Sequence, residues 1–208
     1  MWAIVTGFYK FILHTLEDTL SELFTQCWGK LLYGSFIADN PFHTGVVGTQ
    51  NGNEVSLRTV VLRSTDPDEK QLVFYTDFRS AKMTELKSNS NISWLFYDPV
   101  EKVQVKISGE AIVHHQDEVS LQHWENVHAR GRTAYMSVPG PSTGISEPVD
   151  GLEYLNDSDA INENGYTNFT VVITQANFIE WLRLKSSGHR RAQYRLIDGN
   201  WKGQWLIP

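Results

Sequence analysis

Apolar residues recur at helical spacing in the first part of the chain. Between positions 15 and 33 they fall three or four residues apart, at Leu16, Leu20, Leu23, Phe24 and Cys27. This spacing predicts an amphipathic helix with one buried side. Thr15 and Asp18 have the spacing of a helix-capping pair, although aspartate is shorter than the usual glutamate. We therefore expect residues 1–40 to form an N-terminal helical segment.

From about Phe42 apolar and polar residues alternate, which is typical of strands with one buried face. The segments HTGVVGT and EVSLRTVVLRS flank an Asn-Gly-Asn sequence, which tolerates the positive φ values of a tight turn and predicts a β-hairpin. Further strands are predicted at QLVFYTD, ISWLFYD and EKVQVKISGEAIVHH, with helices at SAKMTELKSN and QDEVSLQHWENVHARG. Three strands are predicted to finish the chain, NFTVVITQA, NFIEWLRLK and RRAQYRLIDGNWKGQWLIP, the last folded as a hairpin around Asp-Gly-Asn.

Many antiparallel strands with helices between them favour a closed β-barrel, because closure removes exposed sheet edges. The length of 208 residues fits one domain better than two, so residues 1–208 are treated as a single domain. Residues 137–168 are rich in Pro, Gly, Asn and Asp. We expect a long acidic loop there, since structureless segments of this length in a compact domain are usually functional or mobile.

The formal charge of −6 argues against a general nucleic-acid or anionic-membrane binder, since such proteins carry excess Lys and Arg. Between Thr133 and Leu182 there is no Lys or Arg, but there are seven acids. The rest of the chain is therefore about neutral, and a local basic pocket is compatible with the acidic total.

The single cysteine, Cys27, cannot form an internal disulfide, which favours a reducing compartment and a packing role for the thiol. The apolar start MWAIVTGFYKFILHTL lacks a basic leading region and is interrupted by Lys10 and His14. It is too short for a membrane span of about 20 residues. We therefore expect a cytoplasmic protein without a membrane partner.

Four basic and hydroxyl residues stand out between positions 56 and 91, where the sequence offers no evident carboxylate partner for them. Arg58 and Arg63 are five apart on a predicted strand and should face opposite sides unless the strand is irregular. Ser80 and Lys82 lie at the predicted start of a helix, where free N–H groups, a hydroxyl and an ammonium form a natural phosphate receptor. The alternative is an ordinary surface helix with solvated Lys and Arg.

Four motifs, in order along the chain, resemble one known family. They are RTVVLR, FYTDFRSAK, VQVKISGEA and the C-terminal IEW…HRRAQYR…W. Together they resemble the pyridoxamine 5′-phosphate oxidase family of FMN-binding split barrels over about residues 44–208. The resemblance implies a mainly β fold, a six-stranded antiparallel split β-barrel with flanking helices. It also implies FMN as the cofactor and a homodimer with FMN at the interface.

The resemblance further implies which residues contact the cofactor. The first flavin-binding strand carries Arg58, Thr59 and Arg63, and Tyr75 and Thr76 match a Tyr-Thr pair that lies along the flavin. Ser80 and Lys82 match the phosphate-contacting turn, and Gln104 matches a glutamine that hydrogen-bonds the flavin ring. Arg191 and Ser142 match contacts from the second subunit. A tryptophan near the flavin falls on Leu182, or on Trp181 if the alignment shifts by one residue.

Departures from the family pattern concern the substrate. Ala81 replaces a second phosphate-binding arginine, for which Arg79 could substitute. An Arg-Leu-His triplet that grips the substrate becomes Ser187, Gly188 and His189, and a Tyr, Arg and Ser cluster becomes Asn126, Arg130 and Ala134. Charge-assisted hydrogen bonds contribute about 1.5–3 kcal/mol each, so we expect a retained flavin site and an altered substrate site. Arg130 and His189 remain as candidate substrate contacts.

Other chemistry finds little support in the sequence. His114 and His115 face opposite ways on a predicted strand, and His123 and His128 are five apart on a predicted helix, so no metal site is expected. No residue is assigned as catalytic. Three functions stay open. The first is an FMN-dependent oxidoreductase that transfers hydride between a small-molecule substrate and flavin N5. The others are a pyridoxine/pyridoxamine 5′-phosphate oxidase and a non-catalytic flavin- or haem-binding protein.

Overall fold

The computed structural model describes residues 19–148 and 165–208. Within them the helices are α2 (Leu20–Phe36), α3 (Ala81–Ser88), α4 (Glu118–Asn126) and α5 (Ala129–Arg132), with short 3-10 helices η1 (Thr133–Tyr135) and η2 (Tyr166–Asn168). The strands are β1 (Thr44–Asn51), β2 (Glu54–Val61), β3 (Ser64–Asp66), β4 (Gln71–Asp77), β5 (Asn91–Asp98), β6 (Val103–His114), β7 (Phe169–Arg183), β8 (Arg190–Ile197) and β9 (Asn200–Leu206).

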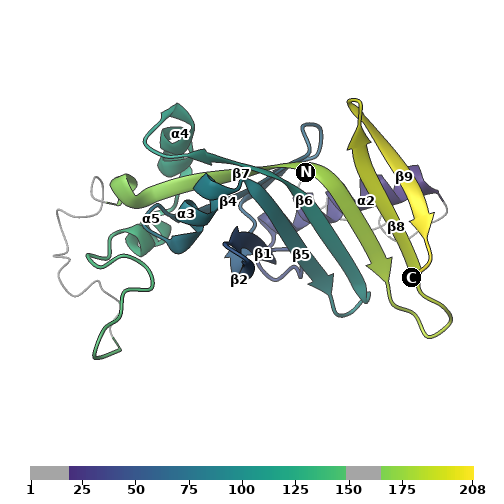
Figure 1. Cartoon of the computed structure of the whole chain (residues 1–208), viewed down its shortest axis with the longest axis horizontal. Coiled ribbons are helices and arrows are strands. Elements are labelled where there is room, and N and C mark those ends of the chain that lie inside the picture. The colour runs from purple at the N-terminus through teal and green to yellow at the C-terminus, as the bar shows by residue number, and fades with distance from the viewer. Residues whose placement is uncertain (1–18, 149–164) are drawn as a thin grey trace, which may run out of the picture.

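The antiparallel strands pair into one sheet, with β8 and β9 at one end of the molecule and α3, α4 and α5 at the other (Figure 1). β1 pairs with β2 and β5, β5 with β6, β6 with β7, β7 with β4, and β4 with β3. β2 continues into β3 across Leu62 and Arg63, where Arg63 N donates to Val73 O at 2.8 Å and Leu62 N donates to His43 O at 2.8 Å. The bent β2–β3 segment therefore joins both edges of the sheet. This confirms the predicted antiparallel barrel, whose ring contains β1, β2–β3, β4, β7, β6 and β5.

The two strands predicted between positions 168 and 185 form one continuous strand, β7. The predicted break was wrong because the strand changes neighbours without ending. Its residues 169–175 pair with β4, and its residues 178–183 pair with β8. β8 and β9 thus extend the sheet beyond the ring.

A bulge at Asn177 of β7 accompanies this change of neighbours, because the consecutive β6 residues Gly109 and Ser108 pair with Ala176 and Phe178. The register between β6 and β7 shifts between Ser108 and Gly109. A Cβ atom on Gly109 would lie 2.0 Å from the Gln175 carbonyl oxygen, so a larger residue would push the two strands apart.

Both predicted tight hairpins are confirmed. Asn51 lies opposite Glu54 across a turn in which Gly52 has a φ of 60°. The β8–β9 turn contains Asp198 and Gly199 with φ values of 51° and 74°, as expected for a two-residue hairpin loop.

The first described helix begins later than the sequence pattern indicates. Thr19 caps α2, accepting a hydrogen bond from Glu22 N at 3.2 Å, while the Glu22 carboxylate accepts one from Thr19 N at 3.1 Å. The predicted capping residues Thr15 and Asp18 lie outside the described residues.

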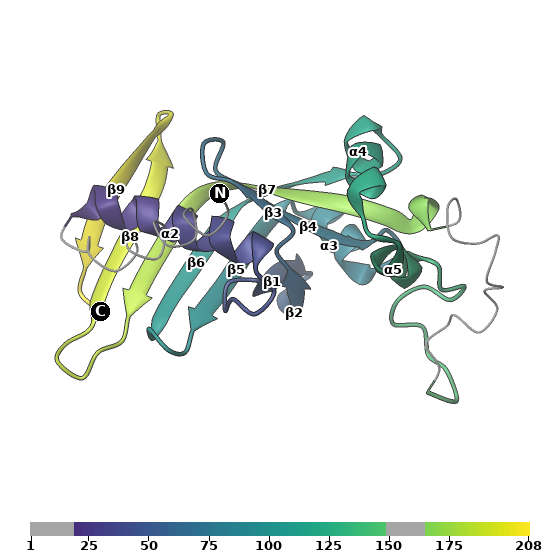
Figure 2. The same ribbon diagram turned by 180° about the vertical axis from the view of Figure 1, so that it is seen from behind.

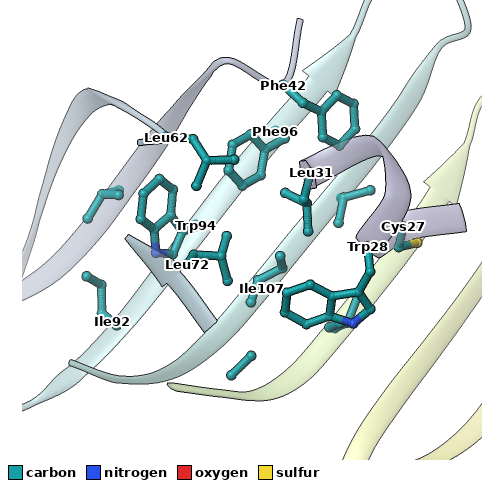
Figure 3. Close-up of a cluster of buried hydrophobic side chains, with 14 of the residues drawn as sticks. Cys27, Trp28, Leu31, Phe42, Leu62, Leu72, Ile92, Trp94, Phe96 and Ile107 are labelled. Carbon is teal, nitrogen blue, oxygen red and sulfur yellow. The ribbon is translucent and has the colours of Figure 1, made fainter. Parts of the chain in front are cut away.

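The buried side of α2 packs against the barrel strands and forms the main core (Figures 2 and 3). Trp28 and Leu31 extend toward Phe96 and Ile107, and all four side chains are buried. Cys27 is 1% exposed, and burial raises the pKa of its thiol to about 12. The thiol is therefore a packing group with almost no reactive thiolate near neutral pH.

The second predicted helix, at 116–131, is divided at Val127, which ends α4 in an extended conformation. Arg132 donates to Val127 O at 3.0 Å and Trp124 O at 2.9 Å, which satisfies carbonyls at the end of α4. Trp124 packs with Phe169 and other side chains in a second, smaller core on the opposite face of β4 and β7. Among the described residues, no helix has the length and apolarity needed to cross a bilayer.

One buried hydrogen bond offers a test of the packing. Trp94 Nε1 donates to Thr174 Oγ1 at 2.9 Å, and both side chains are buried. Replacing Thr174 by valine leaves the indole N–H without an acceptor in the core. We expect the Thr174→Val variant to lose about 1–3 kcal/mol of unfolding free energy, measured by urea titration.

Thr170 provides the matched control for this substitution. It lies on the same strand and is 0% exposed, but its hydroxyl has no hydrogen-bond partner among the described residues. The Thr170→Val variant should therefore change stability by less than about 0.5 kcal/mol or increase it. Equal losses in the two variants would contradict the predicted role of the Trp94 hydrogen bond.

Candidate functional site

A compact polar cluster lies where β4 ends and α3 begins. Lys82 Nζ donates to Thr76 Oγ1 at 2.8 Å and to Ser80 Oγ at 3.0 Å. Ser80 Oγ in turn donates to Asp77 O at 2.7 Å. We call Thr76, Ser80 and Lys82 the Lys82 cluster. The structure thus brings together Ser80 and Lys82, which the sequence assigned to the phosphate-contacting turn, and adds Thr76, which it assigned to the length of the flavin.

The local sequence explains this arrangement. Ser80 is the N-cap residue of α3, but its side chain makes no capping hydrogen bond because its hydroxyl is turned toward Asp77 O. The first N–H groups of an α-helix have no intrahelical acceptor, and they carry partial positive charge. The start of α3 therefore adds donors beside the Lys82 ammonium.

Arg58 lies near this cluster and is paired with a carboxylate. Its NH2 group donates to Glu85 Oε2 at 2.7 Å, and its NH1 group contacts the Thr49 hydroxyl. The expectation that no carboxylate nearby matches these basic residues is therefore wrong for Arg58. Glu85 comes from α3, one turn after Lys82, so a helical reading of the segment could have identified it.

The Lys82 ammonium forms no ion pair with a described carboxylate. Burial, followed by the positive charge of Arg58, lowers the pKa of Lys82 below its usual value, while Glu85 and Asp77 partly oppose this shift. A bound anion would favour the charged form of Lys82. The arrangement therefore favours an anionic ligand over a neutral one.

Arg79 is engaged elsewhere. Its guanidinium pairs with the buried Asp77 carboxylate at 2.7 Å and donates to Ser137 O at 3.0 Å and Val138 O at 3.1 Å. The sequence hypothesis that Arg79 replaces a phosphate-binding arginine is not supported by these contacts, because they commit its guanidinium to Asp77 and to the start of the predicted loop at Ser137 and Val138.

Two other predicted residues do not join the Lys82 cluster. Thr59 is exposed and follows Arg58 directly on β2, so their side chains point to opposite faces. Ser142 is exposed in the loop, with a φ of 66°. The remainder of the predicted 137–168 loop, from 149 to 164, lies outside the described residues.

Tyr75 and Arg63 form a second group on the opposite face of β4 from Thr76. The Arg63 guanidinium lies 5.5 Å from the centre of the Tyr75 ring. The Tyr75 hydroxyl is 2.9 Å from His123 Nδ1, a neighbour that the sequence analysis missed because it lies 48 positions away on α4. Burial lowers the pKa of His123, with a smaller effect from His114, and so favours the neutral imidazole.

Gln104 and Arg191 share a third location. Across the sheet, Gln104 of β6 lies opposite Leu182 of β7, and Leu182 lies opposite Arg191 of β8. Cross-strand partners point to the same face, so these three side chains form one row on the outer face of the sheet. We call Gln104, Leu182 and Arg191 the Gln104 row. Arg191 is held there by Glu180, with NH2 2.8 Å from Oε2.

Trp181 does not belong to this row. It is 3% exposed and lies in the main core, so it points to the inner face of β7. The sequence left the choice between Leu182 and Trp181 open, and the strand register places Leu182 on the face of Gln104.

The Lys82 cluster and the Gln104 row are widely separated within one chain. Thr76 pairs with Thr170 on β7, and Gln104 pairs with Leu182, twelve residues further along the same strand. At about 3.3 Å per residue this is roughly 40 Å along β7. α3 and β8 accordingly lie well apart along the long axis of the molecule (Figure 1).

The candidate substrate residues are separated in the same way. Arg130 is exposed on α5, whereas His189 is exposed in the β7–β8 connection, where its Nδ1 accepts from Lys185 N at 3.2 Å. One chain therefore does not bring Arg130 and His189 together.

Comparison with known proteins identifies relatives of this chain by sequence. A family model described as "Pyridoxamine 5'-phosphate oxidase, FMN-binding domain" matches residues 27–115. The chain is 43% identical over 172 residues to a pyridoxine/pyridoxamine 5′-phosphate oxidase of Vesicomyosocius okutanii subsp. Calyptogena okutanii (strain HA), covering 78% of this chain and 77% of that protein. It is 31% identical over 164 residues to a protein of the same name from Psychrobacter cryohalolentis, covering 75% and 74%.

Solved structures share the fold. A pyridoxamine 5′-phosphate oxidase-related, FMN-binding protein of Nostoc punctiforme PCC 73102 matches with a TM-score of 0.72 and 20% identity, covering 86% of this chain and 94% of that one. PhzG of Burkholderia lata 383 matches with a TM-score of 0.60 and 19% identity, covering 80% and 82%. The relative with 43% identity and the shared fold together show that the chain belongs to the pyridoxamine 5′-phosphate oxidase family of FMN-binding split barrels.

Proposed function

We propose that this protein is an FMN-dependent oxidoreductase that works as a homodimer and transfers hydride between a small-molecule substrate and the flavin. The observation that carries the proposal is the Lys82 cluster, in which an ammonium without an ion-pair partner among the described residues meets two hydroxyls at the start of α3. A phosphate monoester carries about −1.5 to −2 charges near pH 7, which matches these donors.

The chemistry of the donors fits the phosphate of FMN. Lys82 Nζ and the first N–H groups of α3 can each donate to a phosphate oxygen, and the Ser80 hydroxyl can do so by rotating away from Asp77 O. Arg58 adds a second positive charge nearby. Charge-assisted hydrogen bonds of this kind are among the stronger ones in proteins. Ala81, where the family pattern has an arginine, leaves this chain with one charged donor fewer.

Two copies of the chain account for the remaining predicted contacts. About 40 Å along β7 is more than one mononucleotide spans, so the Gln104 row of one copy would have to meet the Lys82 cluster of another. The outer sheet face supports this proposal, because it exposes apolar residues. Val55 and Leu57 are 70% and 67% exposed beside a groove of about 450 Å³. Exposed apolar patches of this kind commonly mark interfaces between proteins.

FMN, when bound, supplies the hydride-accepting or hydride-donating centre. The protein supplies position and charge. The Gln104 amide can hydrogen-bond a flavin ring edge, and the Arg191 cation favours negative charge there. Tyr75, fixed by His123 and Arg63, has its hydroxyl and ring held in one orientation.

Oxidation of pyridoxine or pyridoxamine 5′-phosphate is the second candidate function. It is favoured by the name of the relative with 43% identity. It is opposed by the replacement of substrate-binding residues, because Asn126, Ala134, Ser187 and Gly188 stand where the family pattern has Tyr, Ser, Arg and Leu. A different small-molecule substrate therefore remains our first choice.

Lys82 tests the phosphate site. The Lys82→Gln variant should bind FMN roughly 10- to 100-fold more weakly, because one charge-assisted hydrogen bond is lost, while its affinity for riboflavin should change little. Titration of flavin fluorescence measures both. Lys87→Gln is the control, since Lys87 is exposed on the last turn of the same helix. An unchanged FMN affinity in Lys82→Gln would place the phosphate elsewhere.

Mixed dimers test the proposed two-copy site. Lys82→Gln and Arg191→Gln each impair both sites of a homodimer. A dimer that contains one chain of each kind has one intact site and one doubly substituted site. We expect co-expressed, doubly tagged heterodimers to bind one FMN with the affinity of the unaltered protein. No recovery would mean that Lys82 and Arg191 do not serve one site across two copies.

Turnover separates the two candidate functions. Two assays use the flavin-loaded protein and pyridoxamine 5′-phosphate. In air, the released peroxide is measured. Under anaerobic conditions, the bleaching of the flavin absorbance at about 450 nm is measured. We expect negligible turnover of this substrate but bleaching by other reductants. Sustained peroxide release would establish the second candidate instead.

A further inference from the structure

A buried carboxylate lies about one helical turn after Lys82 on α3. Glu85 is 7% exposed, although its helix α3 is otherwise largely polar. Its Oε1 accepts from Ser56 Oγ at 2.9 Å, and its Oε2 accepts from Arg58 NH2 at 2.7 Å and from the Thr49 hydroxyl. One side chain thus connects α3 with β1 and β2.

Thr49 completes a closed set of contacts around Arg58. Its hydroxyl accepts from Arg58 NH1 and donates to Glu85 Oε2, so two of the guanidinium nitrogens are fixed at once. Burial alone would raise the pKa of Glu85, but the hydrogen bonds from Thr49, Arg58 and Ser56 outweigh it and lower the pKa below its usual value. The carboxylate is therefore charged near neutral pH.

Two cations and one carboxylate meet at this place. Burial lowers the pKa of Lys82 most, and the positive charge of Arg58 lowers it further. Glu85 balances one of the two charges, so the pair can be held together before an anion arrives. The Arg58 side chain still has 22% of its surface exposed, which leaves part of the guanidinium accessible to a ligand.

From these contacts we infer that Glu85 is a positioning residue that holds Arg58 beside Lys82, so that the site prefers a flavin with a phosphate group over one without it. This inference rests on the proposed function. Glu85 acts through Arg58 and does not itself contact the phosphate, since two negative groups would repel each other.

The affinity ratio between FMN and riboflavin tests the inference. Glu85→Gln keeps the size of the side chain but presents a competing N–H₂ group and no charge to Arg58. We expect this variant to reduce the preference for FMN over riboflavin by roughly tenfold or more, with riboflavin affinity nearly unchanged. Fluorescence titration of the purified full-length protein gives both constants, and circular dichroism reports folding.

Thr49→Val is the second variant, and Glu110→Gln is the control. Thr49→Val removes only the hydroxyl between Arg58 and Glu85, so it should lower the ratio in the same direction by a smaller factor. Glu110 is an exposed carboxylate on β6, and its substitution should leave the ratio unchanged. If Glu85→Gln fails to fold, Thr49→Val decides the question, and an unchanged ratio in it would overturn the inference.

Two results with Glu85→Gln would also overturn the inference. Equal weakening of FMN and riboflavin would mean that Glu85 only supports the fold. An unchanged or larger preference for FMN would mean that its charge opposes the phosphate. Failure of the proposed function is distinguishable, because the unaltered protein would then show no preference for FMN over riboflavin.

Discussion

The short passage from β2 to β3 joins the two edges of the sheet. β2 pairs with β1, and after Leu62 and Arg63 the same segment pairs with β4. Without this bend β4 would not be joined to β2, and α3, which follows β4, would not lie beside Thr49 and Arg58. The contacts among Arg58, Glu85 and Lys82 therefore depend on ring closure. Backbone pairing across residues distant in sequence, rather than any local signal, builds the polar site.

The length of β7 has the opposite effect, because it separates residues. One strand of 15 residues carries the partner of Thr76 near one end and the partner of Gln104 near the other. The proposed flavin site consequently has a phosphate part and a ring-contacting part that one chain holds far apart. Neither part contains all the predicted flavin contacts. Under the proposed function, a complete cofactor site would therefore form only when two copies of the chain associate.

The residues that sequence reasoning misjudged share a physical cause. The local sequence shows that Arg79 follows β4, but it does not show that Asp77, Ser137 and Val138 use its donors. It shows Trp181 beside Leu182, but only pairing with β6 and β8 decides which of them faces outward. Glu85 was overlooked because its partners Thr49 and Ser56 precede it by 36 and 29 residues. In each case the deciding partner is remote in sequence.

The sequence by itself determined the alternating strands, both tight hairpins, the helix after Ser80, and, through four family motifs, the family. The strands, hairpins and helix follow from side-chain periodicity and turn chemistry, which act over a few residues. Only the tertiary structure decided that β7 is one strand, that Arg58 is bound by Glu85, and that Gln104 and Arg191 share a row away from Lys82. Pairing and charge compensation between distant segments are properties of the closed barrel, and no local pattern of residues encodes them.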